Sequence, residues 1–393
     1  MTKLFAIAAV ACAAFAQCAH AAPYIPASGN SVVEHLPRRA DPAQQALRQL
    51  RVQLAANPND VALATSVARQ HIATARRETD PRYFGYAQAA LAPWWTMAAP
   101  PTEVRLLRAT LLQSTHHFPE AMRDLDAVVA ADPENAQAWL TRATVQTVRG
   151  DYQAAIASCA RLSRIASQLV SSTCLANVGA MTGRAAASEA LLDLTLRRNA
   201  DADPELQVWV LTLLAEIAER RGENALAEAR YRRALQLSPQ DSYLLGALAD
   251  FLLDQRRGGE VTALLREQTR VDGLLLRYAL ALQQVRGTAA PLARATAELE
   301  ARFQAAMQRG DTVHQREQAR FELQLRGDSK TALALAQKNW AVQKEAADMR
   351  VLLEAAVKAG DRAAAAPVLD WVARNKVEDV ALTRLARALK AGA

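Results

Sequence analysis

The sequence has few aromatic residues, and it lacks the short motifs on which many catalytic sites depend. Phe, Trp and Tyr together make up 5% of its 393 residues. It contains neither a glycine-rich phosphate loop following a strand nor a Gly-x-Ser-x-Gly nucleophile turn. Its basic residues are scattered instead of forming a block with interleaved aromatics. These absences weigh against the common enzyme classes and against nucleic-acid-binding proteins.

Helix-forming residues dominate what is present. Hydrophobic residues make up 51% of the chain, with Ala, Leu and Arg prominent and β-branched residues sparse. Because Ala and Leu favour helices and β-branched residues favour strands, the composition predicts an all-α fold. The formal net charge of +7 is mild for this length and allows only a weak attraction to anionic surfaces.

Residues 1–21 have the pattern of a secretory signal peptide. A lysine precedes an apolar run, and Ala19-His20-Ala21 forms a small-x-small cleavage site. The run is shorter than the about 20 apolar residues that a membrane anchor needs. We therefore expect export to the periplasm or beyond, followed by an extended or disordered leader over 22–40, which is rich in Pro, Ser and Gly. Lipidation of Cys18 is the alternative, although Gln17 stands where a lipoprotein motif has Gly or Ala.

Two of the four cysteines remain after removal of this segment. Cys159 and Cys174 lie at similar distances on either side of a predicted helix-helix turn at 163–167, and residues equidistant from such a turn face each other. In an exported protein such a pair is a candidate disulfide. A disulfide closing a loop of this size stabilises the fold by about 3 kcal/mol. Two buried free thiols are the alternative.

The stretch 208–239 reads as two amphipathic helices joined by a tight turn. Gly222 lies where the first helix must end through a positive φ, and Pro239 stops the second. Residues at helical spacing form the expected buried faces: Leu211, Leu214, Ala215, Ala218, Ala227, Tyr231 and Ala234. With small residues where the helices touch and a length of about 34 residues, this unit resembles a tetratricopeptide repeat (TPR). The resemblance implies a right-handed solenoid with a concave groove.

Similar helix pairs follow one another from residue 61 to 375. The sequence predicts eight complete pairs and part of a ninth, with 136–167 the other clear match. A helix over 41–56 forms an N-terminal half-repeat, and one over 378–390 caps the other end. Because each pair exposes an apolar face that only its neighbour covers, the prediction is one all-α, TPR-like solenoid over 41–393.

The resemblance also implies which side chains contact a partner. In the family, particular positions of each first helix point into the groove, and they carry over here to Trp209, Glu216, Arg220, Tyr243, Asp250, Tyr278 and Phe321. Aromatic and Arg side chains carry most of the energy of protein interfaces, so a peptide or an extended protein segment is the implied ligand. The competing interpretation is that these side chains pack against the next helix. Only Asn177 fits the family's clamp for C-terminal carboxylates, which is therefore not supported.

These features together predict a non-catalytic scaffold or adaptor of the bacterial cell envelope, whose partner is an envelope protein or peptide. The bacterial origin is inferred from the Ala-rich signal and the Ala- and Arg-rich composition. One alternative is a lipid-anchored assembly factor for an outer-membrane or pilus machine. An enzyme or enzyme subunit with a site in the groove and a self-associating structural protein are two others. No cofactor, nucleic acid or transmembrane segment of the mature chain is predicted.

Two further motifs are interpreted as structural. Arg-Gly-Asp occurs at 149–151, 309–311 and 326–328, each time at a predicted turn where Gly takes a positive φ and Asp caps the next helix. A role in adhesion is the alternative. The histidines at 116–117 and His314 lack further ligands at metal-binding spacing, so no metal site is predicted.

Overall fold

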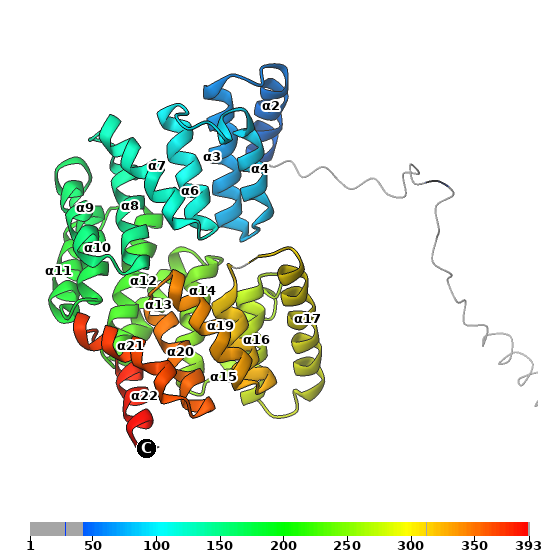
Figure 1. Cartoon of the computed structure of the whole chain (residues 1–393), viewed down its shortest axis with the longest axis vertical. Helices are drawn as coiled ribbons and strands as arrows, with labels where there is room; N and C mark the ends of the chain where they lie inside the picture. The colour runs from blue at the N-terminus through cyan, green and yellow to red at the C-terminus, as the bar shows by residue number, and fades with distance from the viewer. Residues whose placement is uncertain (1–27, 29–41, 312, 392–393) are drawn as a thin grey trace, which may run out of the picture. The chain divides into compact units, whose positions relative to one another are not determined.

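The computed structural model describes Ser28 and residues 42–311 and 313–391 (Figure 1). The predicted signal peptide lies outside the described residues, and so does the predicted leader apart from Ser28. The chain divides into two compact units, Met1–Arg48 and Gln49–Ala393. The described helices belong to the second unit, except that α2 begins in the first.

The regular structure of the described residues is helical throughout, without a strand. The first half of the chain forms α2 (Pro42–Ala56), α3 (Val61–Glu78), α4 (Arg82–Ala90), α5 (Ala92–Trp95), α6 (Thr102–Ser114), α7 (Phe118–Ala131), α8 (Ala136–Arg149), α9 (Tyr152–Ile165), α10 (Gln168–Ala180) and α11 (Ala185–Arg198). The second half forms α12 (Pro204–Arg220), α13 (Asn224–Leu237), α14 (Ser242–Asp254), α15 (Gly258–Leu265), α16 (Asp272–Gln284), α17 (Ala289–Gln308), α18 (Gln315–Phe321), η1 (Glu322–Arg326), α19 (Ser329–Val342), α20 (Ala346–Ala359), α21 (Arg362–Asn375) and α22 (Val380–Ala391). The predicted all-α class is confirmed.

Successive helices pack as pairs, and each pair packs on the next, which makes the unit a helical-repeat solenoid. In the described residues the pairs are α3/α4, α6/α7, α8/α9, α10/α11, α12/α13, α14/α15, α16/α17, α18/α19 and α20/α21. The array is therefore slightly longer than the predicted eight pairs and part of a ninth. Two members of these pairs are short, with 8 residues in α15 and 7 in α18. No helix of the described residues is both long and apolar enough to cross a bilayer.

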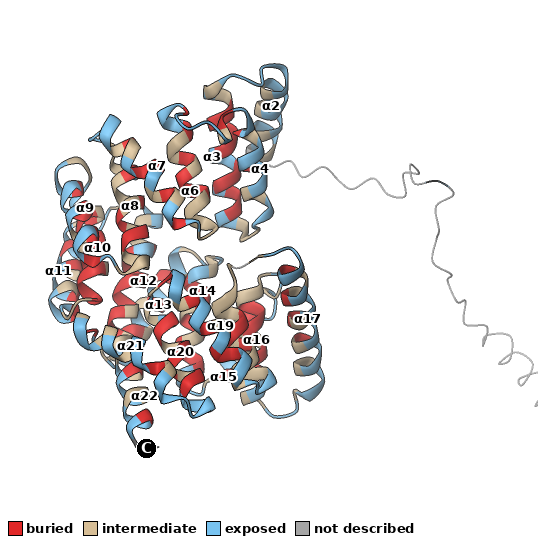
Figure 2. Ribbon diagram, in the orientation of Figure 1, coloured by how far each residue is buried: buried red, intermediate tan, exposed pale blue. Residues whose placement is uncertain are grey.

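The pair α12/α13 has the local structure that its sequence predicts. Asp203 caps α12 by accepting a hydrogen bond from the Glu205 N–H, and Pro204 occupies its first turn. Gly222 follows with a φ of 80°, and α13 ends at Leu237, before Pro239. Every residue predicted for the inner faces is at most 2% exposed: Leu211, Leu214, Ala215, Ala218, Ala227, Tyr231 and Ala234. Figure 2 shows the same one-sided burial along most helices.

Two units depart from the regular form that their sequences predict. The second helix of the first pair breaks at Leu91, which separates α4 from α5. Pro93, in the first turn of α5, cannot donate the backbone hydrogen bond that a continuous helix would need. Further on, α18 continues into the π-helical turn η1, whose wider backbone ends at Gly327 with a φ of 74°.

Late repeats of the solenoid pack on its middle. One buried core joins residues of α8–α10 to residues of α18–α22. At this contact the Lys344 N–H donates to the Val148 carbonyl at 2.7 Å, and the rings of Tyr152 and Trp371 meet edge to face. A Cβ on Gly150 would lie 2.4 Å from the Trp371 ring, so glycine is required there for space as well as for its φ of 81°. The repeats of α8–α10 and those of α18–α22 are therefore held together within one core.

The three Arg-Gly-Asp segments lie at turns, as predicted, and each glycine has a positive φ. Asp328 caps α19 by accepting from the Thr331 N–H at 2.9 Å. The predicted cap is correct in position for Asp151, the N-cap residue of α9, and wrong for Asp311, which precedes the N-cap residue His314 of α18. Asp151 makes no capping hydrogen bond and pairs with Arg149 at 3.8 Å, while Asp311 binds the Val313 N–H ahead of α18.

Candidate functional site

Four of the predicted binding residues come together on two adjacent helices. Trp209, Glu216 and Arg220 lie at intervals of seven and four on α12, which places them on one face of that helix. Tyr243 reaches the same face from the first turn of α14, where its hydroxyl donates to Glu216 Oε1 at 2.6 Å. We call these four residues the α12–α14 surface. Its two aromatic side chains are exposed, Trp209 by 37% and Tyr243 by 66%.

The carboxylate of Glu216 sits in surroundings that disfavour its charge. Burial raises the pKa of Glu216, and the Tyr243 hydrogen bond and the nearby Arg220 only partly oppose this. In turn the Glu216 charge raises the pKa of Tyr243, so the tyrosine stays protonated and remains a donor. The guanidinium of Arg220 contacts Met181 Sδ at 2.8 Å and its own helix's backbone at the Glu216 carbonyl. Among the described residues no carboxylate lies within ion-pair distance of it.

Asp250, the next predicted residue along α14, is bound by the chain itself. Its Oδ2 accepts from Arg277 Nε of α16 at 2.9 Å, and its Oδ1 accepts from Arg320 Nη1 of α18 at 2.6 Å. Burial alone would raise the pKa of Asp250, but the two guanidinium groups hold it at about 2. This carboxylate is therefore occupied, and a partner would have to displace at least one arginine to reach it.

One helical turn beyond, Asp254 binds a more distant helix. Arg350 of α20 donates to both of its carboxylate oxygens, at 2.5 and 2.7 Å, and also donates to Glu354 at 2.7 Å. The pairing of Asp254 with Arg350 was not predicted from the sequence. The sequence prediction overlooked Arg277 and Arg320 altogether. The available signal was an arginine on each of the three first helices that follow α14, namely Arg277, Arg320 and Arg350.

The most perturbed carboxylate of this region is Glu219. Burial raises its pKa to about 8, and the charges of Asp254, Asp250 and Glu216 act in the same direction. The Tyr231 hydroxyl donates to its Oε2 at 2.8 Å, and the Tyr231 ring is 1% exposed in the core. A shifted carboxyl is the feature that the enzyme alternative required. Here burial and the neighbouring carboxylate charges account for the raised pKa, and the Tyr231 hydrogen bond, which opposes it, fixes a core tyrosine.

The remaining two predicted residues lie deeper. Tyr278 of α16 is half-buried and packs against the core of the middle repeats. Phe321 is 2% exposed, and its ring packs against Phe303 with centroids 5.3 Å apart. Phe321 therefore belongs to the hydrophobic core and offers no exposed surface.

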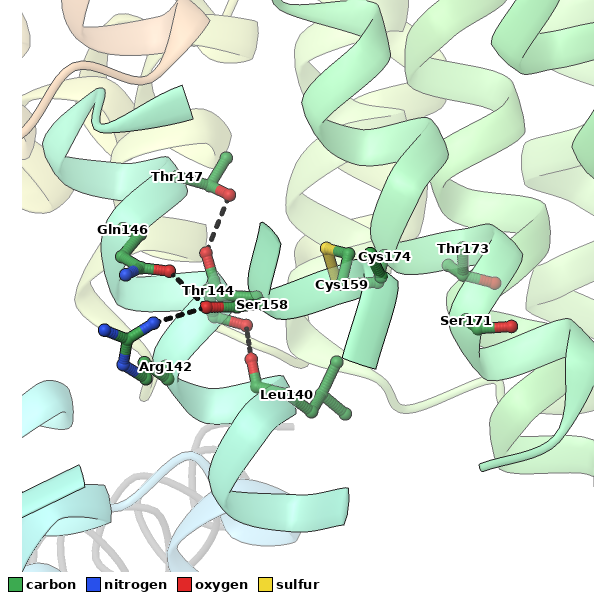
Figure 3. The surroundings of a disulfide bond; sticks show 12 residues. Leu140, Arg142, Thr144, Gln146, Thr147, Ser158, Cys159, Ser171, Thr173 and Cys174 are labelled. Carbon is green, nitrogen blue, oxygen red and sulfur yellow. Dashed lines mark hydrogen bonds between the residues drawn. A yellow bond between two sulfur atoms is a disulfide. The ribbon is translucent and has the colours of Figure 1, made fainter. Parts of the chain in front are cut away.

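The predicted disulfide is present. Cys159 of α9 and Cys174 of α10 are joined, with their Cα atoms 5.6 Å apart (Figure 3). Both side chains are buried, at 0% and 5% exposure. Beside them Ser158 accepts from Arg142 Nη1 at 2.6 Å, so a polar network continues the link from α8 to α9. The described residues contain no group of three or more His, Cys, Asp or Glu side chains placed to hold a metal ion.

Comparisons with known proteins add little to these observations. No family model and no curated protein matches the sequence. Among solved structures, the chain is similar to a protein of the Cut9–Hcn1 hetero-tetramer of APC/C, with 11% identity and a TM-score of 0.44 over 80% of this chain and 52% of that one. It is similar to a tetratricopeptide repeat protein from Parabacteroides merdae, with 13% identity and a TM-score of 0.38 over 73% of this chain and 98% of that one. The chain is also similar to human IFIT1, solved as a dimer with m7Gppp-AAAA. The identity is 16% and the TM-score 0.41, over 89% of this chain and 86% of that one.

The chain thus spans about half the length of the first of these structures. The repeat architecture rests on the helix pairs of this chain itself, whose form resembles that of TPR proteins.

Proposed function

We propose that this chain is a non-catalytic binding scaffold of the bacterial cell envelope, and that it engages a peptide or protein segment through the α12–α14 surface. The carrying observation is the exposure of Trp209 and Tyr243 beside Glu216 and Arg220. Large aromatic side chains are usually buried, and where they are exposed together beside charges they are typical of interfaces. Arg220 in addition makes no ion pair with a carboxylate among the described residues, although its charge acts on Glu216 and Asp379.

The ion pairs of Asp250 and Asp254 also favour the α12–α14 surface as the binding site, because they leave these two carboxylates unavailable to a partner. These two carboxylates are held by Arg277, Arg320 and Arg350, so they shape the interior of the solenoid and leave recognition to the neighbouring face of α12. The proposed contact is therefore smaller than the seven residues that the sequence predicted.

Export to an oxidising compartment is part of the proposal. The buried Cys159–Cys174 link supports it, because structural disulfides persist in secreted and periplasmic proteins and are rare in the cytosol. Lipidation at Cys18, on which the assembly-factor alternative depends, concerns a residue outside the described part of the chain. Labelling with a radioactive fatty acid in the native host separates the two, since only the alternative predicts label on the chain.

The binding proposal is tested with a photo-crosslinking amino acid at position 243. Adducts should form with an envelope protein, and the purified partner should then bind the unmodified chain saturably. Trp209→Ala with Tyr243→Ala should weaken that binding at least about tenfold. Tyr86→Ala is the matched control, because Tyr86 of α4 is an equally exposed aromatic (54%) away from the α12–α14 surface. Equal affinities for the double variant and the control variant would contradict the proposal.

A further inference from the structure

A separate pocket of about 450 Å³ lies where the α5–α6 connection meets α6 and α7. Trp95 and Met97 form part of its apolar wall, and Arg105, Arg108 and Asp124 are polar residues that line it. This volume falls within the range of small-molecule sites. Its residues lie on other helices than the α12–α14 surface, so a ligand bound here is independent of the proposed function.

Arg108 and Asp124 form a satisfied pair in this pocket. Arg108 donates to both oxygens of Asp124 at 2.7 Å and to the carbonyl oxygens of Trp95 and Met97 at 2.7 and 2.9 Å. The side chains of Arg108 and Asp124 are only 12% and 10% exposed. In such a buried, bidentate ion pair the two N–H groups of Arg108 occupy both carboxylate oxygens of Asp124, so Asp124 is not available to form a second pair of this kind.

Arg105 is left without an equivalent partner. Its side chain is 18% exposed, and its buried Nε makes no hydrogen bond to any residue that the structure describes. The nearest carboxylate oxygen, Asp124 Oδ1, is 3.9 Å away and already accepts from Arg108. Among the described residues, the Arg105 guanidinium makes one hydrogen bond, a weak one from Nη2 to the Ala98 carbonyl at 3.3 Å. A buried charged donor without an acceptor is costly, so native sites normally supply one.

The charges of the pocket indicate what that acceptor is. Arg105 and Arg108 face one carboxylate, Asp124, while Arg123 at the rim pairs with Glu120 at 3.3 Å. The pocket therefore has one uncompensated positive charge. A single carboxylate balances it and matches the planar fork of a guanidinium, whereas a phosphate dianion would overcompensate.

We propose that this pocket binds a ligand with one carboxylate group on a short apolar stem, the carboxylate on Arg105 and the stem against Trp95 and Met97. The same chemistry occurs in a small organic acid and in an acidic side chain of a partner protein. The two sources share one site and are distinguished by the choice of probe.

Isothermal titration of the purified full chain tests the proposal. The probes are sodium butyrate and N-acetylglutamate amide, with butyramide and N-acetylglutamine amide as uncharged controls of the same shape. At least one carboxylate should bind saturably, with its control at least about tenfold weaker. Tighter binding of butyrate identifies a free acid, and tighter binding of the glutamate derivative identifies a partner's side chain. Absence of saturable binding for both carboxylates would overturn the proposal.

Variants locate the site. Arg105→Gln should weaken carboxylate binding at least about tenfold. Arg105→Lys keeps the charge but loses the planar pair of donors, so its affinity should lie between those of the wild type and Arg105→Gln. Because Arg105 is under-satisfied without ligand, Arg105→Gln should melt no lower than the wild type. Arg82→Gln, which changes an exposed arginine outside the lining of the pocket, should bind within about twofold of the wild type. Unchanged affinity in both Arg105 variants would place the carboxylate elsewhere and refute the assignment.

Discussion

Arg350 of α20 binds both carboxylate oxygens of Asp254 of α14, across 96 residues of sequence and the two intervening first helices α16 and α18. Both side chains are more than two-thirds buried. Consecutive repeats of a solenoid normally contact only their neighbours, so its curvature is set by small rotations between repeats. A bond that skips two repeats adds a direct constraint on that curvature. The interior of this solenoid is therefore held by ion pairs of the chain's own side chains.

The first prediction concerns this bridge. Arg350→Leu should lower the free energy of unfolding by about 2 kcal/mol, because Asp254 then stays partly buried without its donor. Urea unfolding followed by circular dichroism measures the loss, and small-angle X-ray scattering should show a larger radius of gyration. Arg82→Gln is the control: Arg82 pairs with Asp80 but is 78% exposed, so its loss should leave the free energy of unfolding close to that of the wild type. Equal effects of the two substitutions would show that the bridge does not constrain the fold.

The same bridge marks the limit of prediction from the sequence. The burial of Leu214 and Ala227 follows from spacing within one helix pair, and so does the turn at Gly222, because neighbouring residues alone decide them. The disulfide could be predicted since both cysteines flank one turn. The partner of Asp254 could not, because a contact between distant repeats depends on how rotations accumulate along the solenoid. Phe321 was assigned to the groove by carrying over a family position, and that position says nothing of Phe303 on α17, whose ring packs against it.

The second prediction is a pH dependence due to Glu219. Its pKa in the folded protein is about 8, above the ordinary value of 4.5. Between those two values the folded protein holds a proton that the unfolded chain has released, so the free energy of unfolding falls as the pH rises. Glu219→Gln should therefore be more stable than the wild type at pH 8, by on the order of 2 kcal/mol, and equal to it near pH 4.

Glu228 provides the control of opposite sign. Hydrogen bonds from Arg257 lower its pKa to about 2, so its contribution to stability is present above 4.5 and is lost as the pH falls toward 2. Glu228→Gln should accordingly be less stable than the wild type at neutral pH and approach it in acid. Urea unfolding at a series of pH values measures both slopes. Parallel pH profiles for Glu219→Gln and the wild type would rule out the raised pKa.

The third prediction concerns the Cys159–Cys174 disulfide, which joins α9 to α10 over a separation of 15 residues. Replacing both cysteines by Ala should lower the free energy of unfolding by about 3 kcal/mol, mainly because the unfolded chain gains freedom. A reductant should destabilise the wild type and leave the double variant unchanged, which controls for lost packing. Mass spectrometry of unreduced peptides should recover the two cysteines linked. Two alkylatable thiols in protein purified from the periplasm would contradict the prediction.

The last prediction separates two reasons for a glycine at position 150. Gly150 and Gly327 both follow a first helix with a positive φ, 81° and 74°. A Cβ at Gly150 would clash with the Trp371 ring, whereas nothing lies within 4 Å of one at Gly327. Gly327→Ala should thus lower the free energy of unfolding only by the cost of holding Ala at a positive φ, about 1 kcal/mol. Gly150→Ala should lose that and a further 1 to 3 kcal/mol, roughly, because the Trp371 contact between α8/α9 and α21 must open. In the Trp371→Leu background, where the obstructing ring is absent, the two glycine substitutions should become equal by urea unfolding. If Gly150→Ala remained the more damaging one there, the close approach of Trp371 would not be the reason for the glycine.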